Sequence, residues 1–320
     1  MSTDTGWAYR VAAPHRFERV EDDPPPPLRR GEILVELTAG AVCGSDLPFA
    51  RGAMVPPAGA GLPGRPMHEV VGVVVDTEHC EFSPGDRVVG WASNWDALRQ
   101  RFVTAGDQVA KVRMPGIDAH VTVAQSIACL MTVFDRLGPL AGRSVAIVGV
   151  GPFGLMASAL ARHHGAGRIV GVDPLDRTKD AVGLPFEALV RDTARGWSRG
   201  IAECERPDVV LEMVGHQTST LADAMAAVAT GGTVVAFGVP DDDWYALPMR
   251  EFFRRNGTLV TGVTRDHRVM LERAQDYLTA HAMLAQHMVT NVYPIDHVER
   301  AFEVAMRPRP DQRKVVLEVG

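Results

Sequence analysis

The sequence predicts an α/β protein in which a β-rich segment precedes a doubly wound parallel sheet. Three observations lead to this fold class. Short Val-rich runs, separated by Gly and Pro, fill residues 32–106. Strand-like and helix-like runs then alternate between residues 144 and 263, as in a parallel sheet with crossover helices. A GxGxxG motif lies at the first of these alternations.

The composition and charge of the chain argue against several classes of partner. Its 320 residues are 46% hydrophobic and 22% charged, which suits a large core and two domains. The net charge of −6 argues against nucleic acid or an anionic membrane, because both bind basic surfaces. No apolar run approaches the roughly 20 residues of a membrane span. Four scattered cysteines and no visible signal peptide lead us to expect a cytoplasmic protein.

The first 120 residues are predicted to be rich in β-strands. Val-rich runs cover residues 32–42, 68–77, 86–92 and 101–106. Gly- and Pro-rich stretches, notably residues 56–66, separate these runs and mark turns.

From about residue 121 the hydrophobic pattern changes. Residues 154–165 have a helical pattern that ends on Gly165, a residue type favoured just after a helix. A second helix is predicted at 218–229, and two amphipathic helices follow residue 266. The predicted strands are 144–149, 168–173, 207–215, 231–239, 257–263 and, closing the chain, 314–319.

The glycine motif is the strongest local signal. Its first glycine forms a turn, the second lets the backbone approach a pyrophosphate, and the third lets helix and strand pack closely. The helix N-terminus then offers unpaired N–H groups to phosphates. A purely structural turn is the alternative, but the strand before and the helix after favour a dinucleotide. The expected cofactor-binding residues here are Gly149, Gly151, Pro152, Phe153 and Gly154.

An acidic residue ends the next predicted strand. Asp173 lies 19 residues after Gly154, where a carboxylate accepts hydrogen bonds from the adenosine ribose hydroxyls. It would repel a 2′-phosphate, so we expect NAD rather than NADP. The alternative for Asp173 is a strand-end cap. Arg177 is expected to flank the adenosine or simply to face solvent.

Several motifs together resemble the medium-chain dehydrogenase/reductase family, of the zinc alcohol dehydrogenase type. The resemblance implies a GroES-like catalytic domain, residues 1–120 and 266–320, around a Rossmann NAD-binding domain, residues 121–265. The matching segments, in family order, are GEILVELTAGAVCGSD, GRPMHEVVGVVVD, SPGDRVVG, GVGPFG, GGTVVAFGV and KVVLEV.

The same resemblance implies one catalytic zinc ion. Cys43 and His68 match the family's ligands, and Glu69 is implied as a ligand or a neighbour of the metal. Ser45 would hold the substrate oxygen and pass on its proton. Zinc acts on the alcohol oxygen as a Lewis acid, and hydride then passes to the nicotinamide. The alternatives are that Cys43 is a packing residue, that His68 and Glu69 are a polar pair, and that Ser45 is a turn residue.

The sequence departs from the family's pattern at three places. Met67 replaces the usual glycine before the His–Glu pair, and we expect it to tighten the cleft or reshape the substrate pocket. Pro48 stands where the proton relay often ends in histidine. The four-cysteine lobe is absent between Asp86 and Lys111, so we expect no structural zinc.

The third zinc ligand is not obvious. The family's spacing, counted back from Gly149, lands on Gln125, whose neutral amide is a poor zinc ligand. Cys129 lies four residues later, on the same face of a predicted helix. If this chain is one helical turn shorter than the family between this helix and the strand before Gly149, Cys129 takes the ligand position. The alternative is a buried, apolar Cys129.

The leading hypothesis is therefore a zinc-dependent oxidoreductase that transfers hydride between NAD(H) and a small secondary alcohol, polyol or sugar-like substrate. The alternatives are a zinc-free NAD(P)H-dependent reductase of the same fold and a non-enzymatic NAD-binding protein with a decayed metal site. The family resemblance implies that residues of loops 47–60 and 91–99 form the substrate pocket. In the second loop, Trp91 and Trp95 either line the pocket or pack in the core. Residues 257–263 would form an exposed sheet edge, so we expect a homodimer or homotetramer.

Overall fold

The computed structural model describes residues 5–52, 61–240 and 242–320, which form two compact units. The first unit comprises Met1–Ala128, Arg265–Pro308 and Gln312–Gly320. The second unit comprises Cys129–Thr264 and the short segment Arg309–Asp311. The predicted α/β fold class is confirmed, because the first unit is rich in β-strands and the second contains an all-parallel sheet.

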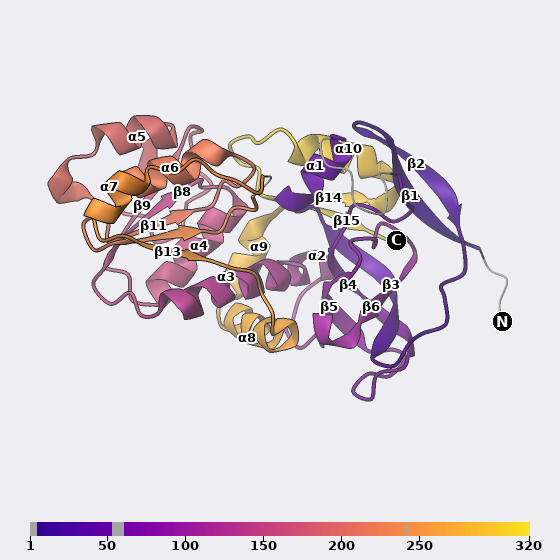
Figure 1. The fold of residues 1–320 in the computed structure, drawn as a ribbon. Coiled ribbons are helices and arrows are strands. Elements are labelled where there is room, and N and C mark those ends of the chain that lie inside the picture. The colour runs from indigo at the N-terminus through magenta and orange to yellow at the C-terminus, as the bar shows by residue number, and fades with distance from the viewer. Residues whose placement is uncertain (1–4, 53–60, 241) are drawn as a thin grey trace. The chain divides into compact units, whose positions relative to one another are not determined.

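The second unit is built on a parallel sheet of six strands (Figure 1). The strand order β10-β9-β8-β11-β12-β13 is that of a doubly wound nucleotide-binding sheet. The edge position of β13 agrees with the edge predicted from its sequence. The bounds are β8 Ser144–Val148, β9 Arg168–Asp173, β10 Ala188–Arg191, β11 Val209–Glu212, β12 Thr233–Ala236 and β13 Thr258–Thr261.

Helices cover both faces of this sheet (Figure 1). On one face, Trp197, Leu221 and Met225 pack on the valines of the central strands. The opposite face carries α4, whose buried Met156 and Leu160 are four residues apart, the spacing of one helix face. The helices of this unit are α4 Pro152–His163, α5 Ala194–Gly200, α6 Thr218–Ala227 and α7 Met249–Arg254, with the short turn η3 Glu203–Glu205.

The first unit contains a mostly antiparallel sheet of seven strands. Its path is β14-β15-β3-β4-β5-β7, and β6 pairs with β3 beside this path. A separate hairpin consists of β1 and β2. The bounds are β1 Gly6–Ala13, β2 Arg16–Asp22, β3 Glu32–Ala41, β4 Glu69–Thr77, β5 Arg87–Trp91, β6 Arg101–Ala105, β7 Val109–Lys111, β14 Val289–Pro294 and β15 Lys314–Glu318.

The helices of the first unit are mostly short, and α3 runs on into the second unit. Three α-helices follow residue 266, where the sequence predicted two. No helix among the described residues is both long and apolar enough to cross a membrane. The elements are η1 Gly44–Asp46, α1 Leu47–Ala50, η2 Gly106–Gln108, α2 Asp118–Val121, α3 Val123–Leu137, α8 His267–Ala280, α9 Ala282–Met288, η4 Ile295–His297 and α10 Val298–Ala305.

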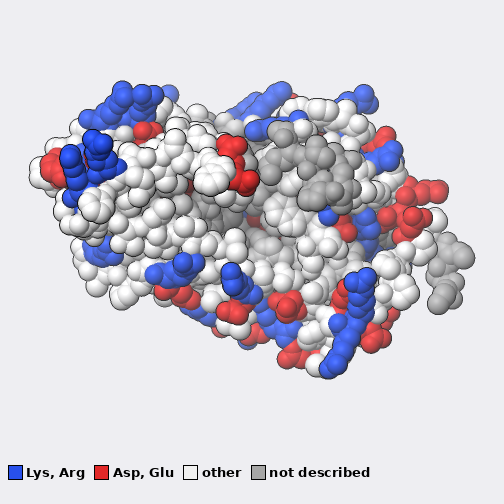
Figure 2. Space-filling model, viewed as in Figure 1, with Lys and Arg blue, Asp and Glu red and all other residues white. Residues whose placement is uncertain are grey.

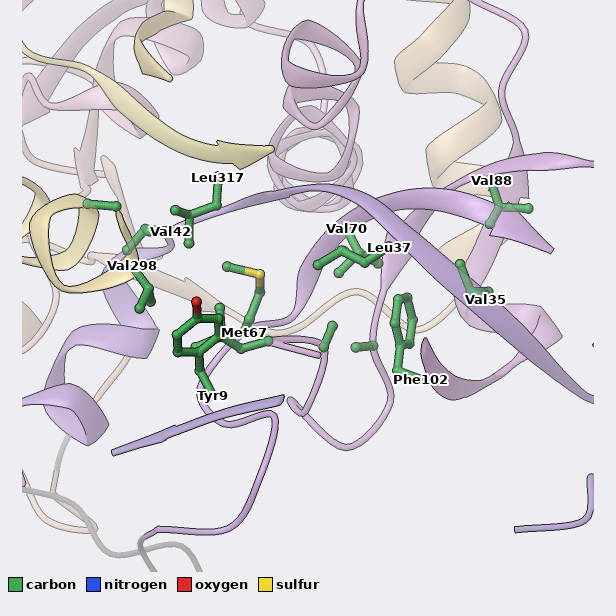
Figure 3. Packing of buried hydrophobic residues seen from close by; sticks show 14 of the residues in the cluster. Tyr9, Val35, Leu37, Val42, Met67, Val70, Val88, Phe102, Val298 and Leu317 are labelled. Atoms are coloured by element: carbon green, nitrogen blue, oxygen red, sulfur yellow. The ribbon is translucent and has the colours of Figure 1, made fainter. Parts of the chain in front are cut away.

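Met67 fills the core of the first unit rather than a cleft. Its side chain is fully buried and lies in the cluster that includes Tyr9, Val42 and Leu317 (Figure 3). The thioether lies directly over Gly40 of β3, where a Cβ atom would overlap the sulfur. The expectation that Met67 reshapes the substrate pocket is therefore wrong: the missing side chain of Gly40 makes room for it inside.

Candidate metal centre and nucleotide site

Cys43 lies in a tight turn that follows β3 and leads into η1. The N–H of Cys43 donates to Asp46 Oδ2 at 2.9 Å, and the N–H of Asp46 donates to the Cys43 carbonyl at 3.1 Å. Asp46 is fully buried, whereas Cys43 is half-buried. These reciprocal bonds fix the turn, so the position of the thiol is set by the backbone that carries it.

His68 directly precedes β4 and is oriented by the same aspartate. Its Nδ1 lies 2.8 Å from Asp46 Oδ1, with both side chains buried. A proton on Nδ1 shared with a carboxylate leaves Nε2 as the electron-pair donor, which is how histidine ligands are commonly held. Burial alone lowers the pKa of His68, but the charge and hydrogen bond of Asp46 outweigh burial and raise it well above its usual value.

Trp95 packs against the imidazole. The two rings stack with centroids 4.3 Å apart, and Phe49 meets the same indole edge-on at 5.6 Å. The backbone of Trp95 has a φ of 58°, and its carbonyl accepts the N–H of Met67. Trp95 thus covers His68. Trp91 instead meets His267 edge-on. Residues 53–60 of the expected pocket loop lie outside the described residues.

Glu69 begins β4 and is fully buried. Its Oε2 accepts a hydrogen bond from Lys314 Nζ at 2.5 Å, and the same ammonium donates to Ser126 Oγ at 2.9 Å. The other carboxylate oxygen, Oε1, is buried and has no hydrogen-bond partner among the described residues. A buried carboxylate oxygen in this state is costly unless a cation or a donor meets it.

These side chains converge on one point. Cys43, His68 and Glu69 each offer a ligand atom, and the three atoms lie within 4.8 Å of one another. Thiolate, imidazole and carboxylate are the ligands that zinc prefers. The buried, unpartnered Oε1 of Glu69 is a further sign that these residues fit such an ion.

The remaining residues expected at this centre have separate positions. Ser45 lies in the η1 turn, two residues after Cys43, and is mostly buried. Cys129 lies on α3 and is the first residue of the second unit, and it is not a member of the three-residue group. Its role as third protein ligand stays a prediction. Gln125 is buried, and its Oε1 has no partner among the described residues.

The glycine motif forms the link from β8 to α4. Gly149 has a φ of +89°, a conformation that favours glycine, and Gly151 caps the helix that starts at Pro152. A Cβ on Gly154 would overlap the carbonyl oxygen of Gly149, so only glycine lets helix and strand approach this closely. Phe153, in the first turn of α4, lies 5.2 Å from the ring of Phe237.

Asp173 ends β9 beside this motif. Its Oδ2 accepts the N–H of Val150 at 2.9 Å, and its Oδ1 accepts the N–H of Leu175 at 2.8 Å. Arg177 approaches the same carboxylate at 3.4 Å. A carboxylate has about four acceptor positions, so capacity remains for ribose hydroxyls. Asp173 and Arg177 line a pocket whose apolar side is formed by Val150, Leu189 and Val190.

Sequence reasoning missed the partners of these residues. Lys314 meets Glu69 from a distant segment and also donates to Ser126, and Asp180 holds Arg177 from the turn that follows it. A lysine at the start of an apolar strand carries no local signal of burial. Only the pairing of β15 with β3, and of β3 with β4, brings Lys314 to Glu69.

Two family models match the chain. Residues 29–132 match the alcohol dehydrogenase GroES-like domain, and residues 122–319 match the glucose dehydrogenase C-terminus. L-threonine 3-dehydrogenase of Streptomyces avermitilis is 28% identical over 70% of this chain and 74% of its own length. D-arabinitol dehydrogenase 1 of Uromyces fabae is 25% identical over 95% of this chain and 96% of its own. The solved alcohol dehydrogenase from Thermus sp. ATN1 has a TM-score of 0.81 at 24% identity, covering 98% of this chain and all of that one.

The β-rich unit, the parallel nucleotide-type sheet and these matches define the class of protein as an oxidoreductase, more narrowly a dehydrogenase. The chain belongs to the medium-chain, zinc-type alcohol dehydrogenase family.

Proposed function

We propose that the protein is a zinc- and NAD-dependent dehydrogenase that interconverts a small secondary alcohol or polyol and the corresponding ketone. The observation that carries this proposal is the convergence of Cys43, His68 and Glu69 within 4.8 Å, with Glu69 Oε1 buried and unpartnered. The relatives named for threonine and arabinitol oxidation support a substrate with neighbouring polar groups.

The residues of the chain divide the chemistry among them. Bound zinc would act as a Lewis acid on the substrate oxygen. Cys43, His68 and Glu69 would hold the ion, and Asp46 fixes two of these three by bonds to the Cys43 N–H and the His68 ring. Ser45, in the same turn, would hold the substrate hydroxyl and accept its proton. Cys129 is proposed as a further ligand.

The cofactor is proposed to be NAD(H). The motif at Gly149–Gly154 and the N-terminus of α4 would bind the pyrophosphate. Asp173, whose carboxylate retains acceptor capacity, would bind the ribose hydroxyls and oppose a 2′-phosphate by charge.

The test is zinc analysis of protein purified without chelator, paired with NAD⁺ reduction over a panel of alcohols, polyols and cyclitols. We expect about one zinc per chain and NADH formation with at least one secondary alcohol. Cys43→Ser should lose both, whereas Cys80→Ser, at an exposed cysteine, should keep both. Zinc-free protein that reduces an activated C=C bond with NADPH would contradict the proposal.

We also propose that the protein is a homodimer, or a tetramer of dimers, joined at the edge strand β13. Leu259 and Val263 are exposed at this edge, and Trp244 and Phe253 are exposed in the segments before it. Figure 2 shows few charged side chains on the surface over β13. An apolar, unpaired strand edge favours pairing with a second chain.

A further inference from the structure

A buried cluster of charges lies beside the proposed ribose-binding carboxylate. Arg177 is 6% exposed and Asp180 is completely buried. The Arg177 guanidinium contacts two carboxylates at once: Nε lies 3.4 Å from Asp173 Oδ1, and Nη1 lies 3.3 Å from Asp180 Oδ2. Asp173 also accepts two backbone N–H groups, so its position is fixed from several sides.

The cluster is closed by a segment from near the end of the chain. Arg177 Nη1 donates to the carbonyl of Arg309 at 3.1 Å, and the N–H of Asp311 donates to Asp180 Oδ2 at 3.3 Å. The three residues 309–311 belong to the same compact unit as Arg177. The guanidinium is therefore held by Asp180 and by a backbone carbonyl, in addition to its contact with Asp173.

The formal charges of this cluster are unbalanced. Arg177 and the two carboxylates that it contacts sum to one net negative charge, and Asp176 and Arg191, which line the same pocket, add one charge of each sign. An arginine beside a ribose-binding aspartate would otherwise be well placed for a 2′-phosphate, because guanidinium groups bind phosphate by charge-assisted hydrogen bonds. In this structure, the Arg177 guanidinium already contacts two carboxylates.

We propose that Asp180 is a specificity-determining residue for the cofactor. It holds the Arg177 guanidinium in place and offsets its charge, so that Arg177 orients Asp173 toward the ribose hydroxyls instead of binding a 2′-phosphate. Asp180 is completely buried and acts through Arg177. The inference rests on the proposed NAD specificity and names the residue that maintains it.

The experiment compares the binding of NADH and NADPH to the full-length chain by isothermal titration, with 5′-AMP and 2′,5′-ADP as probes of the adenosine half. The wild-type protein should prefer NADH. Asp180→Asn keeps the shape of the side chain and removes its charge. We expect it to improve NADPH and 2′,5′-ADP binding about tenfold relative to NADH and 5′-AMP, as one new charge-assisted contact would.

Two further variants show whether the effect passes through Arg177. Arg177→Met/Asp180→Asn should return the preference to near the wild-type value, because the released cation is gone. Asp311→Asn changes an exposed carboxylate but keeps the N–H that meets Asp180, so it should leave the preference unchanged.

The inference is overturned if Asp180→Asn changes the preference less than twofold, or if the gain persists in the double variant. Should Asp180→Asn fail to fold by circular dichroism, Asp180→Ser, which removes the same charge, takes its place. A gain in NADPH binding relative to NADH in that variant supports the inference, and an unchanged preference overturns it. A wild-type protein that prefers NADPH would instead refute the proposed cofactor itself, which the titrations of the unmodified chain reveal first.

Discussion

Lys314 Nζ lies 2.5 Å from Glu69 Oε2, although the two residues are 245 positions apart in the sequence. Lys314 begins β15 and Glu69 begins β4, with β3 between these strands. Both side chains are almost completely buried. The pair therefore places a cation behind one oxygen of a candidate metal ligand and leaves the other oxygen for the ion.

Removing the lysine charge should destabilise the fold. A buried ion pair that loses one partner leaves an uncompensated charge, at a cost of about 3–5 kcal/mol. We expect Lys314→Met to lower the free energy of unfolding by that amount in urea titrations. Lys314→Met/Glu69→Gln should recover much of it. Lys179→Met, at an exposed lysine, is the matched control and should change stability little. A loss below about 1 kcal/mol in Lys314→Met would refute this account.

The metal centre can be dissected by zinc content, independently of turnover. Glu69→Gln and Cys43→Ser should each reduce zinc well below one ion per chain, because each removes an anionic ligand. If Cys129 is a further ligand, Cys129→Ser should do the same, whereas Cys204→Ser, at an exposed cysteine, should retain the ion. Full zinc and full activity in Cys129→Ser would end the proposal for that residue.

Asp173→Ala should weaken NADH binding by roughly 1–3 kcal/mol, the cost of leaving polar groups unpaired. The change removes the acceptor for the ribose and also releases the N–H groups of Val150 and Leu175. Titration calorimetry measures the effect, and Asp243→Ala, at an exposed aspartate, serves as control. Unchanged NADH affinity would mean that Asp173 only caps its strand.

Substitutions at Gly40 and Met67 should have coupled effects on the free energy of unfolding. Gly40→Ala would place a methyl group on the Met67 sulfur in a packed core, and overpacking of this kind costs about 1–3 kcal/mol. In a Met67→Ala background the same change should cost less, because the obstructing side chain is absent. A double-mutant cycle from chemical unfolding measures this coupling, and additive effects would contradict the packing described here.

A charge at the β13 edge should separate the proposed dimer. Leu259→Asp places a carboxylate on the exposed edge and should shift the mass measured by light scattering toward the monomer. Val182→Asp introduces the same charge at another exposed apolar residue of the second unit and should leave the mass unchanged. A monomeric wild-type protein at micromolar concentration would refute the proposed assembly.

The sequence predicted what short-range patterns encode. The glycine turn at Gly149 needs a positive φ and a close helix contact, and both requirements are visible as residue types at fixed spacing. Cys43 and His68 were singled out through a family resemblance, not through spacing alone. The short strand β10 and helix α5 were not predicted, because a strand of three half-buried residues and one exposed residue, like a seven-residue helix, has little periodicity.

Partners that meet across the fold could not be predicted. The space that Met67 occupies exists only because β3 carries Gly40 opposite it. The role of Asp180 depends on where the backbone of residues 309–311 passes. Both features arise from tertiary packing, which determines the position and role of a side chain where the local sequence does not.

The position of β15 after all the strands of the second unit has a consequence for the order in which these parts are made. All six strands of the second unit have been synthesised by residue 261, so its sheet can form while the ribosome is still translating. The end of β3 that pairs with β15, residues Ala39–Ala41, waits until residue 318 has emerged. Because Lys314 arrives with β15, Glu69 is without its lysine until the next 245 residues have been synthesised, and the metal centre is completed after the parallel sheet of the second unit.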